Sequence, residues 1–141
     1  MPGEIKLVHK VPPDDFTRAG EASSSVKKTL KQLGVSPEVI RKVAIAMYEG
    51  EINMVIHANG GEIETKIYPD KVEMVLKDTG PGIADIDKAM EAGYSTAPEE
   101  VRNLGFGAGM GLPNMKRYTD EMTIESVVGE GTTVRMTVYI N

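Results

Sequence analysis

The chain of 141 residues contains no cysteine, so disulfide bonds and thiolate chemistry are excluded. Its two histidines, His9 and His57, lie far apart in the sequence and make no metal-ligand pattern. The formal net charge of −5 argues against nucleic acid as the main partner. No apolar run reaches membrane-spanning length, and the N-terminus has no signal-peptide core. We therefore expect a cytoplasmic protein that binds neither nucleic acid nor membrane.

The rest of the composition is ordinary for a globular protein, and the length predicts one domain over residues 1–141. Apolar and polar residues alternate as in strands over Ile5–Val11, 62–67, 71–77, 122–126 and 132–140. Helices are predicted over residues 16–33, from Ser36 to about residue 59, and over 112–118. Asp14 or Asp15 can cap the first helix and Gly34 ends it, and Ser36 is the N-cap of the second. This order predicts an α+β fold, a two-layer α/β sandwich in which helices cover one face of a mixed, mostly antiparallel sheet.

The second half of the long predicted helix, residues 44–58, combines polar and apolar groups in an unusual way. One helical stripe contains three isoleucines and two polar residues: Ile45, Glu49, Ile52, Asn53 and Ile56. Burying a carboxylate and an amide without partners is costly, so a metal ion or a reacting group could satisfy Glu49 and Asn53. The alternative is a helix edge where both groups touch water. Glu51 points away from this stripe and is interpreted as an ordinary solvated charge.

Two glycine-rich stretches follow. Residues 78–82, Asp-Thr-Gly-Pro-Gly, stand where a strand ends. An aspartate there can accept a hydrogen bond from an exocyclic amine, and the glycines let a ligand approach the backbone closely; a plain turn is the alternative. Residues 105–112, Gly-Phe-Gly-Ala-Gly-Met-Gly-Leu, precede a short helix, and their N–H groups could form an anion site. A flexible lid without a ligand is the alternative, and the spacing matches neither the Walker A pattern nor the dinucleotide fingerprint.

Together these stretches resemble the ATP-binding domain of the GHKL superfamily, the Bergerat fold. Residues 49–53 resemble its N box, residues 78–82 its first glycine box, and residues 105–112 its second. Gly131-Thr132 resembles the Gly-Thr pair beyond it, and the four motifs, in the right order, cover nearly the whole chain. With no predicted dimerisation helices before the domain and no transducer domain after it, the chain is similar to free-standing anti-sigma factor serine/threonine kinases of the RsbW, SpoIIAB and RsbT type.

The resemblance implies roles for individual residues. Glu49 would be the general base that takes the proton from a substrate hydroxyl, and Asn53 would bind Mg²⁺. Asp78 would bind the adenine amine of ATP. The glycine boxes and the Gly-Thr pair would supply the other ATP contacts: Gly80, Gly82, Gly105, Gly107, Gly109, Met110, Gly111, Leu112 and Thr132. Residues 97–104 form a longer lid than expected for the RsbT-like branch, and the resemblance assigns no role to Ser95, Thr96 or His57.

The function implied by the resemblance is an ATP-dependent serine/threonine protein kinase that phosphorylates a STAS-domain anti-sigma antagonist. The alternative is a nucleotide-gated binding module that sequesters a sigma factor or activates a phosphatase, with little kinase activity. Glu49 favours catalysis, because binding alone would need no base. A fragment of a sensor histidine kinase is disfavoured, because residues 5–33 lack the phospho-acceptor helix pair. The partner, the signal and the oligomeric state, a homodimer included, are left open by the sequence.

Overall fold

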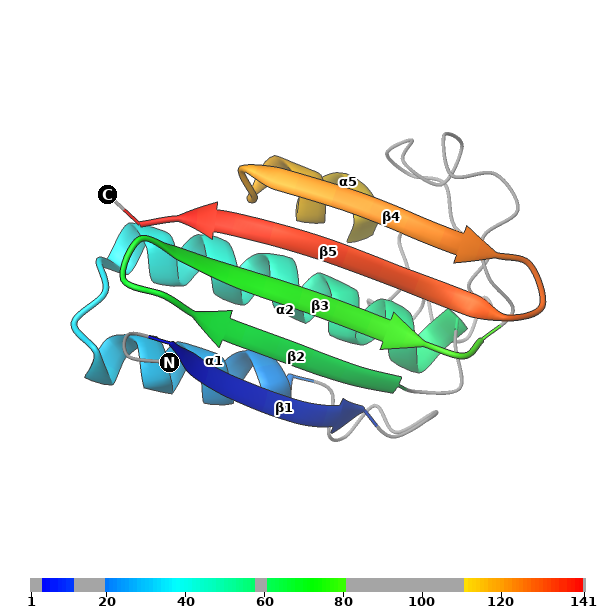
Figure 1. Cartoon of the computed structure of the whole chain (residues 1–141), viewed down its shortest axis with the longest axis horizontal. Helices are drawn as coiled ribbons and strands as arrows, with labels where there is room; N and C mark the ends of the chain where they lie inside the picture. The colour runs from blue at the N-terminus through cyan, green and yellow to red at the C-terminus, as the bar shows by residue number, and fades with distance from the viewer. Residues whose placement is uncertain (1–3, 12–19, 58–60, 81–110, 141) are drawn as a thin grey trace, which may run out of the picture.

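A computed structural model of the chain describes residues 4–11, 20–57, 61–80 and 111–140. The described strands form one five-stranded sheet in the order β1-β2-β3-β5-β4. The strands are β1 (Ile5–Val11), β2 (Gly61–Ile67), β3 (Lys71–Asp78), β4 (Glu121–Val127) and β5 (Gly131–Tyr139). Helices α1 (Glu21–Gln32), α2 (Pro37–His57) and α5 (Gly111–Arg117) lie on one face of this sheet (Figure 1). The predicted α+β two-layer sandwich is confirmed, although each described strand pair is antiparallel, so the sheet is not mixed in this part of the chain.

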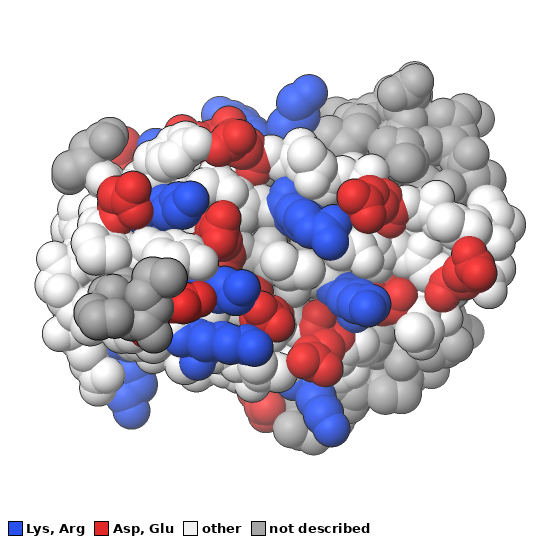
Figure 2. Space-filling model, in the orientation of Figure 1, with Lys and Arg blue, Asp and Glu red and all other residues white. Residues whose placement is uncertain are grey.

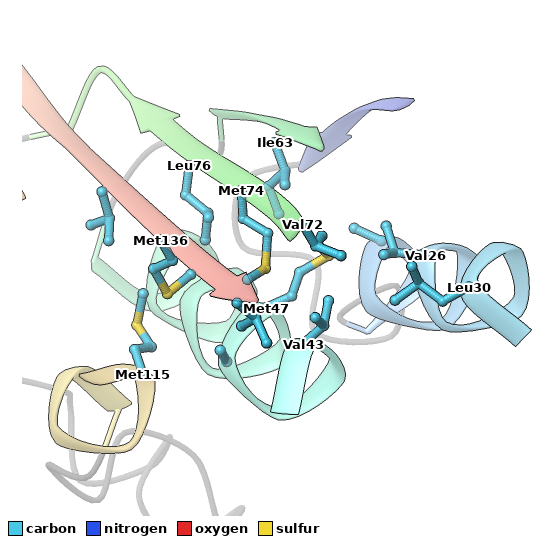
Figure 3. Packing of buried hydrophobic residues seen from close by; sticks show 14 of the residues in the cluster. Val26, Leu30, Val43, Met47, Ile63, Val72, Met74, Leu76, Met115 and Met136 are labelled. Atoms are coloured by element: carbon cyan, nitrogen blue, oxygen red, sulfur yellow. The ribbon is translucent and has the colours of Figure 1, made fainter. Parts of the chain in front are cut away.

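The hydrophobic core lies between these helices and the sheet (Figure 3). Four of its largest fully buried side chains are methionines: Met47 from α2, Met74 from β3, Met115 from α5 and Met136 from β5. Methionine is unbranched and adapts to irregular gaps, so it suits a layer where three helices meet a twisted sheet. Burying each such side chain contributes roughly 1.5–3 kcal/mol. The alternation read from the sequence thus places one face of each central strand in this layer.

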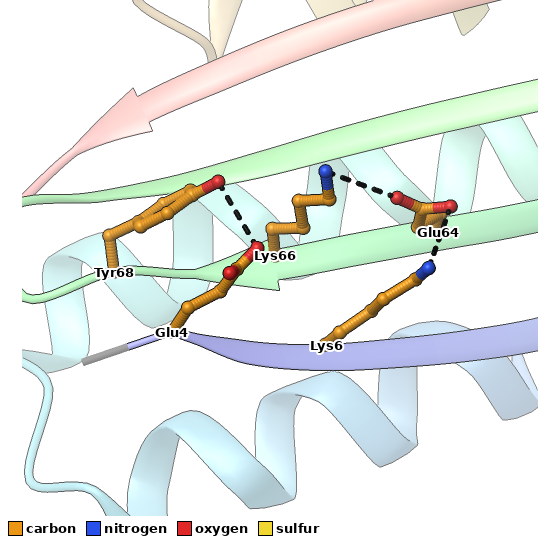
Figure 4. A network of polar contacts seen from close by, with 5 residues as sticks. All are labelled: Glu4, Lys6, Glu64, Lys66 and Tyr68. Carbon is orange, nitrogen blue, oxygen red and sulfur yellow. Dashed lines mark hydrogen bonds and ion pairs between the residues drawn. The ribbon is translucent and has the colours of Figure 1, made fainter. Parts of the chain in front are cut away.

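The other face of the sheet is polar, and charges of both signs alternate across it (Figure 2). Glu64 of β2 lies 3.7 Å from the ammonium of Lys6 on β1 and 3.5 Å from that of Lys66 (Figure 4). Tyr68 donates a 3.4 Å hydrogen bond to Glu4 at the end of the same pair of strands. Exposed pairs of this kind contribute little stability. They make this face solvent-compatible, whereas the helix side holds the core.

The helix boundaries follow from local chemistry. Helix α1 begins at Glu21, directly after Gly20, which stands in the left-handed region with φ 99°. Residues 16–19 of the predicted helix lie outside the described residues. The proposed caps Asp14 and Asp15 lie outside the described residues. Gly34, with φ 77°, follows the end of α1, as its sequence predicted. Ser36 caps α2 as expected, since its hydroxyl accepts a 3.4 Å hydrogen bond from the N–H of Val39.

Glu51 is not the solvated charge that the sequence suggested, because its side chain is only 2% exposed. Its carboxylate accepts hydrogen bonds from the N–H groups of Gly20 (2.9 Å), Ala22 (3.1 Å) and Ser23 (3.2 Å). Such N–H groups at a helix start have no partner within the helix, and they carry the positive end of its dipole. Gly20, the N-cap residue of α1, makes no side-chain cap, so a residue of α2 caps α1. This contact fastens the two helices together.

We therefore expect Glu51→Ala to lower the free energy of unfolding by about 3 kcal/mol, because it leaves buried N–H donors without partners. Glu51→Gln keeps one acceptor and should lose less. Urea denaturation followed by circular dichroism measures both. Glu38→Ala, at an exposed position of the same helix, is the matched control and should change stability by less than about 0.5 kcal/mol. A loss for Glu51→Ala no larger than that of the control would contradict the capping role.

Candidate functional site

Glu49 and Asn53 stand one turn apart on α2, and both are half-buried. The fully buried stripe of α2 runs instead through Val43, Met47 and Met54 towards the sheet. The predicted stripe with the isoleucines lies beside this fully buried stripe, on the flank of the helix. Of its apolar members Ile52 is buried and Ile45 half-buried. The helix edge considered as the alternative describes Glu49 and Asn53 better, because both are partly exposed.

Gly50 explains how this flank comes close to the neighbouring elements. A Cβ atom at Gly50 would lie 2.2 Å from Cδ2 of Leu76 on β3 and 3.1 Å from Cε of Met115 on α5. A larger residue at this position would therefore require the buried side chain of Leu76 to move, and glycine lets α2 pack closely against both elements. The sequence carried a signal for this contact, because an isolated glycine inside a helix costs about 1 kcal/mol and usually has a packing reason.

Asn114 on α5 is a neighbour of Glu49 that sequence reasoning missed. Burial raises the pKa of Glu49 above its ordinary value, and the polar side chain of Asn114 offsets part of this rise. A carboxylate of this kind binds a proton more readily than a solvated one, which is what a general base requires. The sequence offered one indication that Asn114 lies near the site, because this residue belongs to the short helix directly after the second glycine-rich stretch.

Asp78 and Thr132 meet at one end of the sheet, as the pairing of β3 with β5 places them opposite each other. Oδ1 of Asp78 accepts hydrogen bonds from the N–H groups of Gly80 (2.9 Å) and Thr132 (3.2 Å). The hydroxyl of Thr132, which is 8% exposed, lies 2.9 Å from that of Ser126 on β4. Because both backbone bonds end on Oδ1, the orientation of the Asp78 carboxylate is set by the main chain.

Glycines allow the chain to close around Asp78. Gly131 has φ 142°, and a Cβ there would lie 2.2 Å from the carbonyl oxygen of Asp78. A Cβ at Gly61 would lie 2.5 Å from Cε of Met54 and 3.1 Å from Cα of Asp78. Met54 follows Asn53 on α2, so this contact brings the C-terminal half of α2 to the end of β3. Three distant segments of the sequence therefore converge at one end of the molecule, visible where β3 ends and β5 begins (Figure 1).

Some predicted ATP contacts are not placed by the structure. Gly111 and Leu112 open α5. The remaining glycine-box residues lie outside the described part of the chain: Gly82, Gly105, Gly107, Gly109 and Met110. Within the described residues, no group of three or more histidine, aspartate or glutamate side chains could hold a metal ion. No helix of that part is long and apolar enough to cross a bilayer.

Solved structures of low sequence identity support the fold. The RsbU and RsbW domains of a Mycobacterium tuberculosis protein superpose with a TM-score of 0.66 at 15% identity. That superposition covers 96% of this chain and 32% of the other. The mycobacterial sensor histidine kinase MprB superposes with a TM-score of 0.55 at 15% identity, covering 97% of this chain and 99% of the other. At such identities the likeness concerns the fold alone.

Sequence relatives are closer. An anti-sigma F factor of Caldanaerobacter subterraneus subsp. tengcongensis is 34% identical over 97% of this chain and 92% of its own length. The serine/threonine-protein kinase RsbT of Bacillus subtilis is 34% identical over 77% of this chain and 79% of its own length. The histidine kinase-like ATPase domain family matches residues 13–138. The match spans most of the chain, with Glu49, Asn53, Asp78 and Thr132 inside it, and this chain belongs to the histidine kinase-like ATPase domain family.

Proposed function

We propose that residues 1–141 form one ATP-binding domain that acts as a serine/threonine protein kinase of the anti-sigma switch type, with a STAS-domain antagonist as its substrate. The names of the two relatives, an anti-sigma factor and a serine/threonine kinase, support this class of function. The observation that carries the kinase proposal is the environment of Glu49. Its half-buried carboxylate has a raised pKa and stands one turn from Asn53, on the helix that reaches the end of β3.

Asp78 suits recognition of adenine. Its Oδ1 is held by two backbone N–H groups, so Oδ2 is the oxygen that would accept a hydrogen bond from the exocyclic amine. We place the backbone of Gly80 and the Thr132 hydroxyl beside the base, with Gly82 completing this side of the pocket. The glycines of residues 105–111 would bind phosphate oxygens through their N–H groups.

Asn53 fits a magnesium ligand. Its carboxamide oxygen is of the type that Mg²⁺ prefers, and it is half-buried rather than enclosed. The lack of an acidic cluster among the described residues is compatible with this ion, which usually keeps several waters and binds phosphate oxygens. When bound, Mg²⁺ would neutralise part of the phosphate charge.

Glu49 would act directly on the protein substrate. As a serine or threonine hydroxyl oxygen bonds to the γ-phosphorus of ATP, the Glu49 carboxylate accepts the hydroxyl proton. The bond from the γ-phosphorus to the bridging oxygen breaks, and ADP leaves with that oxygen. Positioning and charge neutralisation supply most of the catalysis in this reaction, so a single base on a rigid helix suffices.

A nucleotide-gated binding module is the second candidate, because the first relative is named only as an anti-sigma factor. In that function the same pocket would bind ATP, and the nucleotide-bound domain would hold a sigma factor. Glu49 would then have no proton to accept. The two candidates therefore differ in what a substitution of Glu49 does.

Binding of adenine nucleotide is tested with Asp78→Asn. We expect its affinity for ADP, measured by isothermal titration calorimetry, to fall by roughly tenfold or more, because the carboxylate that recognises the amine is lost. Binding of inorganic triphosphate, which has no adenine, should change much less. Asp70→Asn, in the exposed turn between β2 and β3, is the matched control and should bind ADP normally. Equal losses for ADP and triphosphate would refute the adenine assignment.

Catalysis is tested with Glu49→Gln, which keeps the shape of the side chain but removes the base. We expect ATP affinity within a few-fold of wild type and phosphoryl transfer to a STAS-domain protein lowered by roughly 10²-fold or more. Asn53→Ala should instead weaken Mg²⁺-dependent binding and transfer together. Transfer of labelled phosphate is the readout, and Glu38→Gln, exposed on the same helix, is the control. Near wild-type transfer by Glu49→Gln would exclude Glu49 as the base.

The second candidate function is supported if the wild-type protein transfers no phosphate and binds a sigma factor only when ATP is bound. This outcome can be measured by size-exclusion chromatography of the two purified proteins with and without nucleotide.

A further inference from the structure

We propose that a cationic patch on α2 and α5 is the docking site for an acidic surface of the protein substrate. The patch consists of Arg41 on α2, Lys116 and Arg117 on α5, and Tyr118 directly after α5. The inference rests on the proposed function, in which a protein substrate brings a hydroxyl to Glu49. It adds a chemical property of that substrate which the four motifs do not specify.

Tyr118 restrains two guanidinium groups. That of Arg41 lies 5.8 Å from the centroid of the Tyr118 ring, and that of Arg117 lies 5.6 Å from it. Both distances are in the range of cation–π contacts, which use none of the N–H donors of a guanidinium. The N–H of Tyr118 donates a 3.1 Å hydrogen bond to the carbonyl of Asn114, so the backbone that carries the ring continues the turn of α5. Less side-chain freedom is therefore lost when a carboxylate binds these arginines.

The cations of the patch are exposed and have no carboxylate partner within the described part of the chain. None of the ion pairs there includes Arg41, Lys116 or Arg117. On the other side of the molecule, by contrast, one cation on each of β1, β2, β3 and β5 lies within 3.7 Å of a glutamate. The chain as a whole carries a net charge of −5, so the patch is opposite in sign to the average surface. It is complementary to a partner that presents carboxylates.

The carboxylates that stand near these cations in the sequence are engaged elsewhere. Glu38 lies 3.7 Å from the ammonium of Lys42. Asp120 accepts a 2.8 Å hydrogen bond from the N–H of Tyr139, and Glu121 accepts one from the hydroxyl of the same tyrosine. The neighbouring acidic side chains therefore leave the patch to a carboxylate from outside the molecule.

The patch lies close enough to Glu49 for one partner to contact both. Arg41 stands on the same helix, about 12 Å away along the axis and about 80° away around it. Helix α5 follows α2 over this distance, because Met115 packs at Gly50 and Tyr118 meets Arg41. A protein interface of standard size covers about 800 Å² on each partner, a radius of about 16 Å. A substrate centred on Glu49 is therefore large enough to contact the patch.

Arg41 separates docking from a purely structural role. Lys116 and Arg117 stand in the last turn of α5, where positive charge also stabilises the helix dipole. Arg41 stands near the start of α2, where a positive charge brings no such benefit. We therefore expect Arg41→Ala to leave the melting temperature nearly unchanged and to weaken binding of the substrate.

The experiment compares steady-state phosphorylation of a STAS-domain protein by wild type and by the double variant Arg41→Ala/Arg117→Ala. We expect KM for the protein substrate to rise roughly tenfold, with kcat and KM for ATP within about twofold of wild type. Lys10→Ala/Lys28→Ala, which removes the same charge from exposed positions of β1 and α1, is the matched control and should leave all three constants unchanged. Tyr118→Leu keeps both charges but removes the ring, so it should give a smaller rise in KM.

A second measurement tests the patch without any kinase activity. Fluorescence anisotropy at low salt follows binding of a labelled oligoglutamate peptide, which we expect to be several-fold weaker for the double arginine variant than for wild type and for the lysine control. Unchanged binding of the peptide and an unchanged KM in the folded arginine variant would overturn the inference, as would equal effects in the lysine control. If peptide binding depends on the arginines but the wild-type protein transfers no phosphate, the acidic docking site stands and the kinase proposal fails.

Discussion

The close approach of α2 to β3 and α5 at Gly50 is the contact on which the candidate site depends. A Cβ atom at this position would lie 2.2 Å from Cδ2 of Leu76 and 3.1 Å from Cε of Met115, so at least the Leu76 side chain would have to move. Helix α5 packs along α2 at this level, beside Glu49. The same approach seals the core, since Leu76 and Met115 are both almost completely buried. The packing beside Glu49 therefore depends in part on one glycine in the middle of a long helix.

Three consecutive residues of α2 contact three different elements. Glu49 faces α5, Gly50 lies against β3, and Glu51 caps the start of α1. A helix turns by about 100° per residue, so adjacent side chains point in different directions and can meet different elements. Glu51 and Glu49 carry the same functional group, yet one stabilises the fold and the other is available for chemistry. Their surroundings, rather than their identity, make this difference.

The other half of the site depends on strand pairing. Asp78 and Thr132 are separated by more than fifty residues, and the antiparallel register of β3 and β5 sets them opposite each other. Two glycines, Gly61 and Gly131, permit the close backbone contacts around Asp78. The main chain thereby holds the carboxylate through Oδ1, so recognition of a ligand would need no reorganisation of this side chain.

Local sequence determined most of the described secondary structure, because alternation, helix caps and glycine stops act between residues that are close in the chain. Alternation predicted the five strands, Ser36 predicted the start of α2, and Gly34 predicted the end of α1. The order of the motifs also predicted the family, since four short motifs can be recognised from the sequence alone. The order of the strands in the sheet could not be predicted from the sequence, because strand pairing joins residues that are far apart in the chain.

Only the tertiary structure decided that Glu51 is buried and that Asn114 lies near Glu49. Periodicity predicted that Glu51 faces solvent, but the first N–H groups of α1, which have no partner within that helix, bond to its carboxylate and make its burial favourable. Those donors belong to another helix, so no pattern within α2 could reveal them. Asn114 likewise lies near Glu49 because α5 packs on α2. The sequence by itself determined the elements and the motifs, whereas the partners of each buried polar group depended on how distant elements pack.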